Sequence, residues 1–261
     1  LEQVWENHKE ICGTNGNKFE FFPILIKFID AKNNLSIQVH PDNDYAMRVE
    51  GEYGKTEAWY ILDCDEGAEL ILGFNREVSV EEFKKAAQSE EMLNIVNKVK
   101  VKKGDLFFIE SGTLHAICKG ILLAEVQQNS NTTYRVYDYG RVGADGKPRA
   151  LHIDKAADVT KLYPPTIPNA SERAVEKQDG GTRTHLTECD LFKMYSVETD
   201  GEYVSEAGDE SFVSLLCLDG SAEVVCGKKT LGMKKGESLF IPASSGEFKI
   251  IGKTHMLETR I

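Results

Sequence analysis

Four side chains in the first half of the sequence are of the types that bind a divalent metal ion. Gln38 and His40 lie two residues apart in an alternating segment, so as strand residues they point to the same face of a sheet. Glu57 and His115 follow downstream. Imidazole nitrogens together with amide and carboxylate oxygens are common ligands of divalent metals. The sequence therefore predicts one metal site built from these four residues.

Each of these residues taken alone has a more ordinary explanation. A single histidine in a β protein is more often a hydrogen-bonded core residue than a metal ligand, at roughly three to one. A lone glutamate at a strand end is usually solvated, and a lone glutamine usually belongs to an edge strand. The joint occurrence of all four at this spacing is what favours the metal site.

The segments that must position these residues are predicted to be mainly strands. A capping box formed by Ser79 and Glu82 predicts a helix over residues 79–88, and a second short helix is expected over 152–162. The polar segment 41–54 is expected to be a loop. Strands are expected at residues 21–30, 35–40, 59–62, 68–74, 98–101, 106–109, 116–117, 121–128 and 134–138.

An internal repeat links the two halves of the chain. Residues 101–109 (VKKGDLFFI) match residues 233–241 (MKKGESLFI), and residues 59–69 resemble residues 212–223. The matched blocks lie farther apart in the first copy, where the helix over residues 79–88 fills the difference. Many short strands with few helices and this repeat predict an all-β protein of two related β-barrel units, the first with a short helical insertion.

The expected domain organisation follows from the repeat and from one proline-rich segment. Three prolines lie within residues 164–168, which permit neither a helix nor a central strand. We therefore expect a metal-binding unit over residues 1–162, a linker over 163–190 and a second unit over 191–261.

The repeat also provides an internal comparison for the metal site. Counting along the two copies places Leu191, Lys193, Glu210 and Glu247 opposite Gln38, His40, Glu57 and His115, in that order. The second copy keeps the signals of the fold but has lost the set of ligands. The fold itself therefore does not require the ligands, which favours a site in the first copy only.

Composition and charge limit the possible partners. The 261 residues carry a formal net charge of −11, which argues against a nucleic-acid or anionic-membrane partner. Six cysteines without a CxxC spacing are typical of a reducing cytoplasm, and no bilayer-spanning run or signal peptide is present. Because the sequence begins at Leu1 within a polar run, we expect a further segment to precede it. The oligomeric state stays open.

The motifs resemble a known enzyme family. The Gln-x-His, Glu and later His pattern is similar to the two cupin motifs, with Gln38 where cupins often have a first histidine. Four segments also resemble type I mannose-6-phosphate isomerase, most closely the short bacterial form. These are LSIQVHP (35–41), KTE (55–57), GTLHA (112–116) and NSNTTYRVYD (129–138). The resemblance is dense over residues 5–162 and looser beyond them.

The resemblance implies two jelly-roll (cupin) barrels and a zinc enzyme, with one Zn²⁺ per chain. The expected reaction interconverts mannose 6-phosphate and fructose 6-phosphate through an enediol(ate). The family's metal ligands carry over onto Gln38, His40, Glu57 and His115. Its active-site arginine carries over onto Arg135, and its lysines carry over onto Lys55 and Lys27. Arg135 and Lys55 are expected to assist catalysis, and Lys27 to bind the sugar phosphate.

This chain departs from the longer family members at two places. They read Lys-Pro-Glu where this chain has Lys55-Thr56-Glu57, and they insert a helical domain that is larger than the helix expected here. The base that moves the proton between C2 and C1 is not identified by the sequence. Lys55 and a metal-bound water are both candidates.

Two other functions are compatible with the same residues. A different metal-dependent cupin enzyme, such as an iron dioxygenase, usually presents a third imidazole where this chain has Gln38. The second alternative is a cupin that binds a sugar phosphate through the same lysines and arginine but does not convert it. The bound metal distinguishes the first alternative, and turnover distinguishes the second.

Overall fold

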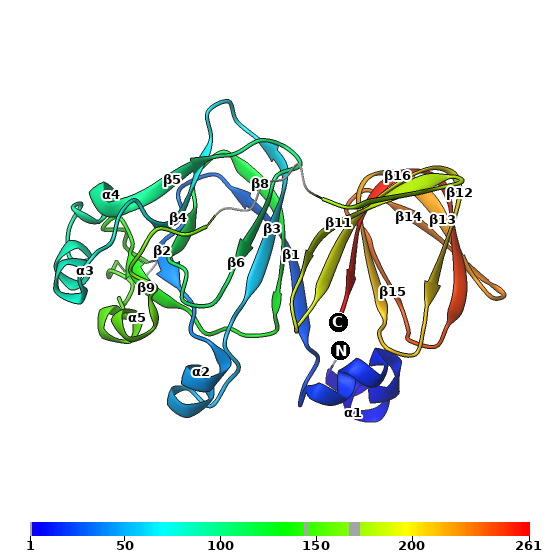
Figure 1. Cartoon of the computed structure of the whole chain (residues 1–261), viewed down its shortest axis with the longest axis horizontal. Coiled ribbons are helices and arrows are strands. Elements are labelled where there is room, and N and C mark those ends of the chain that lie inside the picture. Colours follow the sequence, from blue (N-terminus) through cyan, green and yellow to red (C-terminus); the bar gives the residue numbers. More distant parts are fainter. Residues whose placement is uncertain (1, 144–145, 167–172) are drawn as a thin grey trace. The chain divides into compact units, whose positions relative to one another are not determined.

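The structure is a computed structural model that is mostly β, with a few short helices (Figure 1). It describes residues 2–143, 146–166 and 173–261. Within these ranges no helix is both long enough and apolar enough to cross a membrane.

The chain divides into two compact units whose boundaries differ from the expected ones. A central unit comprises residues 25–169, and a terminal unit comprises residues 1–24 and 170–261. The N-terminal segment was expected to belong with the metal-binding unit. Instead it pairs with C-terminal loops, since the amide of Thr14 donates to the carbonyl of Asp209 at 2.9 Å and the amide of Asn15 donates to that of Glu210 at 2.9 Å. Backbone hydrogen bonds over such a separation cannot be seen in the sequence.

The central unit contains two antiparallel sheets. A four-stranded sheet has the order β1-β8-β3-β6, and a five-stranded sheet has the order β5-β4-β7-β2-β9. The strands are β1 (Ile24–Ala31), β2 (Ile37–Val39), β3 (Glu57–Cys64), β4 (Glu69–Phe74), β5 (Val96–Lys100), β6 (Leu106–Ile109), β7 (His115–Ile117), β8 (Ile121–Gln128) and β9 (Tyr134–Tyr137).

Alternation along the strands separates two hydrophobic cores. Trp59 of β3 and Leu70 of β4 belong to a core contributed by both sheets. Ile71, the next residue of β4, belongs to a second core on the other face of the five-stranded sheet, where Phe83 packs from a helix. The face of this sheet that points toward the four-stranded sheet is therefore the one that can carry an enclosed site.

Helices cover the outer face of the five-stranded sheet (Figure 1). The central unit contains α2 (Asn43–Val49), α3 (Val80–Ala86), α4 (Met92–Ile95) and α5 (Ile153–Val159). The expected helix after Ser79 is confirmed, because the Ser79 hydroxyl accepts a hydrogen bond from the Glu82 amide at 3.1 Å. The expected loop over residues 41–54 is wrong in part, since α2 lies within it and is capped by the Asp42 side chain.

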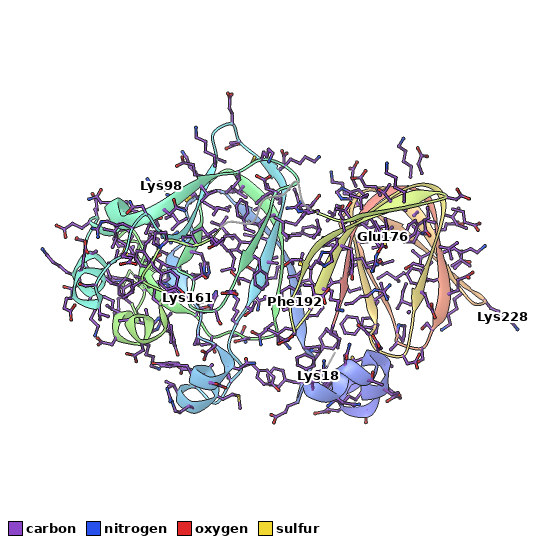
Figure 2. The ribbon with its side chains drawn as sticks, in the orientation of Figure 1. Lys18, Lys98, Lys161, Glu176, Phe192 and Lys228 are labelled. Carbon is purple, nitrogen blue, oxygen red and sulfur yellow. The ribbon has the colours of Figure 1, made fainter. Side chains whose placement is uncertain are left out.

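The terminal unit is built mainly from long strands. Its seven strands have the order β10-β11-β12-β16-β13-β14, with β15 pairing with β13. Lys228 lies in the turn between β13 and β14 (Figure 2). The elements are α1 (Glu2–Asn7), the 3₁₀ helices η1 (Lys9–Cys12) and η2 (Thr14–Lys18), β10 (Val175–Gln178), β11 (Gly181–Glu188), β12 (Lys193–Ala207), β13 (Val213–Cys226), β14 (Lys229–Lys234), β15 (Ser238–Ile241) and β16 (Gly246–Arg260).

The strand pairing supports part of the expected fold class. A mostly-β chain in two units, with a short helical insertion in the first, is confirmed. Two closed jelly-roll barrels are not confirmed, because none of the three sheets closes on itself within the described residues.

The expected linker over residues 163–190 is partly strand. Within it, β10 and β11 pair with each other, and β11 continues the sheet by pairing with β12 from Gly181↔Thr199 to Glu188↔Lys193. Residues 167–172 of the expected linker lie outside the described residues. The second β unit therefore begins before residue 191.

Strand pairing also corrects the correspondence between the two copies of the repeat. Ile109 and Ile241 are matched residues, and they pair with Glu57 and Val213 respectively. Val213, rather than Glu210, is thus the counterpart of Glu57. In the terminal unit Lys193 of β12 pairs with Arg260 of β16, and in the central unit β1 lies next to β8 in the same way. The start of β12 is therefore the counterpart of β1. Lys193 thus does not correspond to His40, which follows the strand of Gln38. The second copy still lacks the ligand at this position, because valine cannot bind a metal.

We expect that Ser79→Ala lowers the free energy of unfolding by about 1 kcal/mol, because the cap of α3 is lost. Denaturant titration monitored by circular dichroism measures this change. Ser221→Ala, at an exposed position on β13, is the matched control and should be nearly neutral. Equal losses in the two variants would contradict the role of the cap.

Candidate metal centre

Three of the four predicted ligands converge inside the central unit. Nε2 of His115 lies 3.3 Å from Oε1 of Glu57, and Nε2 of His40 lies 3.6 Å from Oε2 of the same carboxylate. Their ligand atoms all lie within 4.8 Å of one another, and the three side chains are buried. We call His40, Glu57 and His115 the metal cluster.

The two sheets place these residues from opposite sides. Gln38 on β2 and His115 on β7 are direct cross-strand partners, so their side chains share one face of the five-stranded sheet. His40 follows β2 by one residue and lies on the same face as Gln38. Glu57 is the first residue of β3 in the four-stranded sheet. The cluster is therefore fixed by rigid strands.

A glycine turn leads the chain into β7 and the cluster. The Gly112 amide donates to the carbonyl of His40 at 2.7 Å, which ties this turn to the backbone beside β2. Gly112 has a φ of 82°, and a Cβ at this position would lie 2.8 Å from the carbonyl oxygen of Val159. Only glycine fits here without strain. The turn thereby sets the position of His115 relative to His40.

Backbone carbonyls orient both imidazoles. Nδ1 of His40 donates to the carbonyl of Thr132 at 2.9 Å, and Nδ1 of His115 donates to the carbonyl of Thr113 at 2.8 Å. With the proton on Nδ1, each Nε2 presents a lone pair toward Glu57. This pattern of outer hydrogen bonds is the one that fixes metal-binding histidines.

Burial controls the protonation of the cluster. It lowers the pKa of His40 well below its usual value, and it lowers the pKa of His115 to about 4. Burial, with a further contribution from the charge of Glu125, raises the pKa of Glu57 to about 7. The histidines are therefore neutral, as ligands must be, and a bound cation would favour the ionised form of Glu57.

The polar atoms that face the cluster are poorly satisfied. Nε2 of His40 and Oε1 of Glu57 are buried and find no hydrogen-bond partner among the described residues. Buried polar atoms are normally paired, and leaving one unpaired costs about 1–3 kcal/mol. A divalent cation between these atoms would satisfy them, so the donor set fits a metal ion.

Gln38 lies beside the cluster as the fourth predicted ligand. Its Nε2 lies 3.4 Å from Nε2 of His115. A half-turn of the amide about its last bond exchanges nitrogen and oxygen, which directs Oε1 to the same point. The structure thus places all four predicted ligands together.

The two predicted lysines occupy different places at the site. Lys55 is 6% exposed, and its Nζ lies 3.1 Å from Oε2 of Glu57, so it contacts the cluster directly. Nζ of Lys27 instead donates to Oε1 of Glu125 at 2.8 Å and to Oε1 of Gln127. Lys27 is partly exposed and has no such contact with the cluster among the described residues.

Arg135 lies on the same face of the five-stranded sheet as the ligands. It is the cross-strand partner of Gln38, while Gln38 in turn faces His115, so the three residues form a row across β9, β2 and β7. Nη1 of Arg135 donates to the carbonyl of Ala150 at 2.9 Å. Its Nε is buried and has no hydrogen-bond partner within the described residues. The guanidinium is therefore anchored through Nη1, while its buried Nε is left without a partner among the described residues.

Sequence reasoning missed Glu125 and Gln127, which support the site from β8. Glu125 accepts from Nε1 of Trp59 at 3.1 Å, and the Trp59 ring packs edge-on against His115 with 5.3 Å between ring centroids. Glu125 thus links Lys27 to the packing behind His115. A signal was present in the sequence, because Glu125 and Gln127 are polar residues at alternate positions of a strand in which only Gln128 is also polar.

We expect His115→Ala to lose its bound metal because one imidazole ligand is removed. The affinity for zinc should fall by more than the roughly 10–100-fold that loss of an outer hydrogen bond to a ligand produces. Elemental analysis and zinc titration of the folded variant measure this loss, with exposed His8→Ala as the control. An unchanged zinc affinity in His115→Ala would rule the cluster out as the metal site.

Two family models match the chain. The model described as phosphomannose isomerase type I, catalytic domain, matches residues 1–75. The model described as mannose-6-phosphate isomerase, cupin domain, matches residues 182–260. These matches fall on both units of the structure.

Relatives from Bacillus subtilis are similar over nearly the whole chain. A probable mannose-6-phosphate isomerase, GmuF, is 40% identical over 253 residues, which are 97% of this chain and 78% of the relative. The mannose-6-phosphate isomerase ManA is 39% identical over 254 residues, also 97% and 78%. A crystal structure of the mannose 6-phosphate isomerase from Bacillus subtilis superposes with a TM-score of 0.91 at 38% identity, over 100% of this chain and 82% of that one. The chain therefore belongs to the type I mannose-6-phosphate isomerase family.

Proposed function

We propose that this chain interconverts mannose 6-phosphate and fructose 6-phosphate at the metal cluster, with one zinc ion per chain. The observation that carries the proposal is the buried cluster itself, in which neutral histidines and a carboxylate face one point with unpaired atoms. The family relatives, which carry the name of this reaction, add support. Zinc when bound supplies a positive charge that polarises the oxygens at C1 and C2 of the sugar.

The proposed reaction needs a proton to move between C2 and C1 through an enediol(ate). Lys55 is the described cation nearest to Glu57, and it is positioned to stabilise negative charge that develops on the sugar oxygens or to move the proton. Arg135 shares this face of the sheet from β9 as the cross-strand partner of Gln38, and it is the second proposed cation of the reaction. A water molecule is the other candidate for the base.

Lys27 is the proposed contact for the phosphate group. Glu125 and Gln127 hold its ammonium, and its side chain is 37% exposed, so a third partner can reach it. A phosphate fixed at a distance from the cluster would orient C1 and C2 toward it, which is how binding energy lowers a reaction barrier.

Two alternatives keep the same site but differ in outcome. Another metal-dependent cupin enzyme would use the cluster for different chemistry, and a sugar-phosphate-binding cupin would bind without turnover. Lys55 contacts the cluster, and the positive charge of Lys27 also acts on Glu57, which favours a phosphorylated ligand over an uncharged one. We further propose a cytoplasmic location, with which the six free thiols agree.

We expect the purified chain to convert mannose 6-phosphate to fructose 6-phosphate, and to lose this activity on chelation. Zinc added back should restore it, whereas His115→Ala should stay inactive under all conditions. A coupled assay for fructose 6-phosphate makes the measurement. A folded, zinc-loaded protein that binds the sugar phosphate without converting it would favour the binding-protein alternative.

We expect Lys27→Gln to raise KM by about 10-fold or more, because a charge-assisted bond to the phosphate is lost. Zinc content should be unchanged, since Lys27 does not contact the cluster. Lys103→Gln, an exposed lysine in the turn before β6, is the control with the same change of charge. An unchanged KM for Lys27→Gln would place the phosphate elsewhere.

A further inference from the structure

The terminal unit contains a cavity of about 570 Å³ that the proposed reaction does not use. Three cations line it from separate strands, namely Arg183 of β11, Lys193 of β12 and Arg260 of β16. Its volume lies within the range of pockets that hold small ligands. We call this the terminal-unit cavity. None of the metal-cluster residues lines it.

A fully buried carboxylate holds two of these cations in place. Oε1 of Glu258 accepts from Nη2 of Arg183 at 2.7 Å and from Nε of Arg260 at 2.8 Å. One carboxylate shared by two guanidinium groups leaves this trio with a net charge of about +1. Nε of Arg183 is buried and finds no hydrogen-bond partner in the described part of the chain. The trio is rigid, positively charged and incompletely paired.

Further contacts direct the two guanidinium groups. The guanidinium of Arg183 stacks over the ring of Tyr195 at 3.4 Å from its centroid, and Nη2 of Arg260 lies 3.4 Å from Oγ of Ser205. Nη1 of Arg183 lies 3.5 Å from Glu176, which is mostly exposed on β10 (Figure 2). Lys193 pairs with Glu188 at 3.2 Å, and both side chains are more than two-fifths exposed. Exposed pairs of this kind are weak and exchange readily for a better anion.

The repeat shows that Glu258 of this trio corresponds to the glutamate that holds Lys27 in the central unit. Phe107 and Leu239 are matched residues of the two copies, and their strand partners are Trp59 and Leu215. On their other sides these partners face Glu125 and Glu258 respectively. Glu258 is therefore the counterpart of Glu125. Each copy uses a buried glutamate on its last long strand to hold cations.

The metal-binding part of the site has no counterpart in the terminal unit. Val213 occupies the position of Glu57, and it is fully buried in an apolar core. The terminal unit thus keeps a buried glutamate that binds cations, here Arg183 and Arg260, and has an aliphatic side chain in place of a metal ligand. Such a site can bind an anion but cannot perform the metal-assisted step.

Acidic side chains on the rest of the cavity wall restrict the ligand. Glu206, Asp209 and Glu210 line it together with Asn15 and Ser211. A ligand that is anionic throughout would be repelled by these carboxylates. A ligand with one anionic end and several hydroxyl groups would satisfy both parts, because hydroxyls donate to carboxylates while the anion binds the guanidinium groups.

We propose that the terminal-unit cavity binds a sugar phosphate as a second, non-catalytic site, with the phosphate on Arg183, Lys193 and Arg260. The site rests on geometry outside the metal cluster, so it stands or falls separately from the proposed reaction. It would give each chain two sites for one class of ligand, one that converts it and one that only binds it.

Calorimetric titration of the zinc-loaded chain with fructose 6-phosphate tests this proposal. We expect two equivalents bound per wild-type chain, and about 10-fold weaker binding at one of them in Lys193→Gln. Turnover by Lys193→Gln at saturating substrate should equal that of the wild type. Lys253→Gln, on β16 and 82% exposed, is the matched control and should bind like the wild type.

We expect Arg260→Gln to lower the affinity of the cavity for fructose 6-phosphate more than Lys193→Gln does. Circular dichroism of this variant shows whether the terminal unit stays folded. Lys193→Gln keeps the test decisive if Arg260→Gln fails to fold, since its side chain is exposed. Binding of fructose 6-phosphate that neither Lys193→Gln nor a folded Arg260→Gln weakens would overturn the proposal, whereas one equivalent that both variants weaken would instead count against binding at the metal cluster. If inorganic phosphate binds the cavity as tightly as fructose 6-phosphate does, the sugar hydroxyls add no affinity. That result would overturn the proposed hydrogen bonds from the hydroxyls to the acidic side chains.

Discussion

The burial of the Glu57 carboxylate between two neutral imidazoles is the constraint around which the central unit is built. An ionised carboxylate removed from water is unfavourable by several kcal/mol unless cations surround it. Lys55 supplies one cation, and a divalent ion bound by the unpaired atoms of Glu57 and His40 would supply another. Burying this carboxylate therefore destabilises the folded state, and hydrophobic packing of the two sheets elsewhere must offset the loss.

The surrounding structure supports this arrangement through backbone groups and not through the ligands alone. Carbonyl oxygens of Thr113 and Thr132 fix the tautomers of the two histidines. Cross-strand pairing then sets Gln38 between His115 and Arg135 on one face. Strand pairing and main-chain hydrogen bonds therefore determine where these side chains lie.

The two copies of the repeat bury different side chains at matched positions of one β scaffold. In the second copy the position of Glu57 is taken by Val213. No charge is buried there, and Val213 is part of the hydrophobic core of the terminal unit. The buried glutamate on the last strand is present in both copies, as Glu125 and Glu258. A paired charge can be buried at lower cost than an unpaired one, which explains how this feature fits both cores.

The sequence by itself determined the elements whose signals are local. Alternation predicted most strands, and the capping box at Ser79 predicted α3, because both depend on neighbouring residues. The ligand types predicted the metal cluster. Tertiary structure alone decided the features that depend on distant partners. The exposed strand β10 exists only through pairing with β11, α2 buries little apolar surface, and residues 1–24 join the terminal unit by long-range hydrogen bonds. Likewise, Glu125 becomes a site residue only when the fold brings Trp59 and Lys27 to it, because hydrogen bonds between strands carry no signature in local sequence.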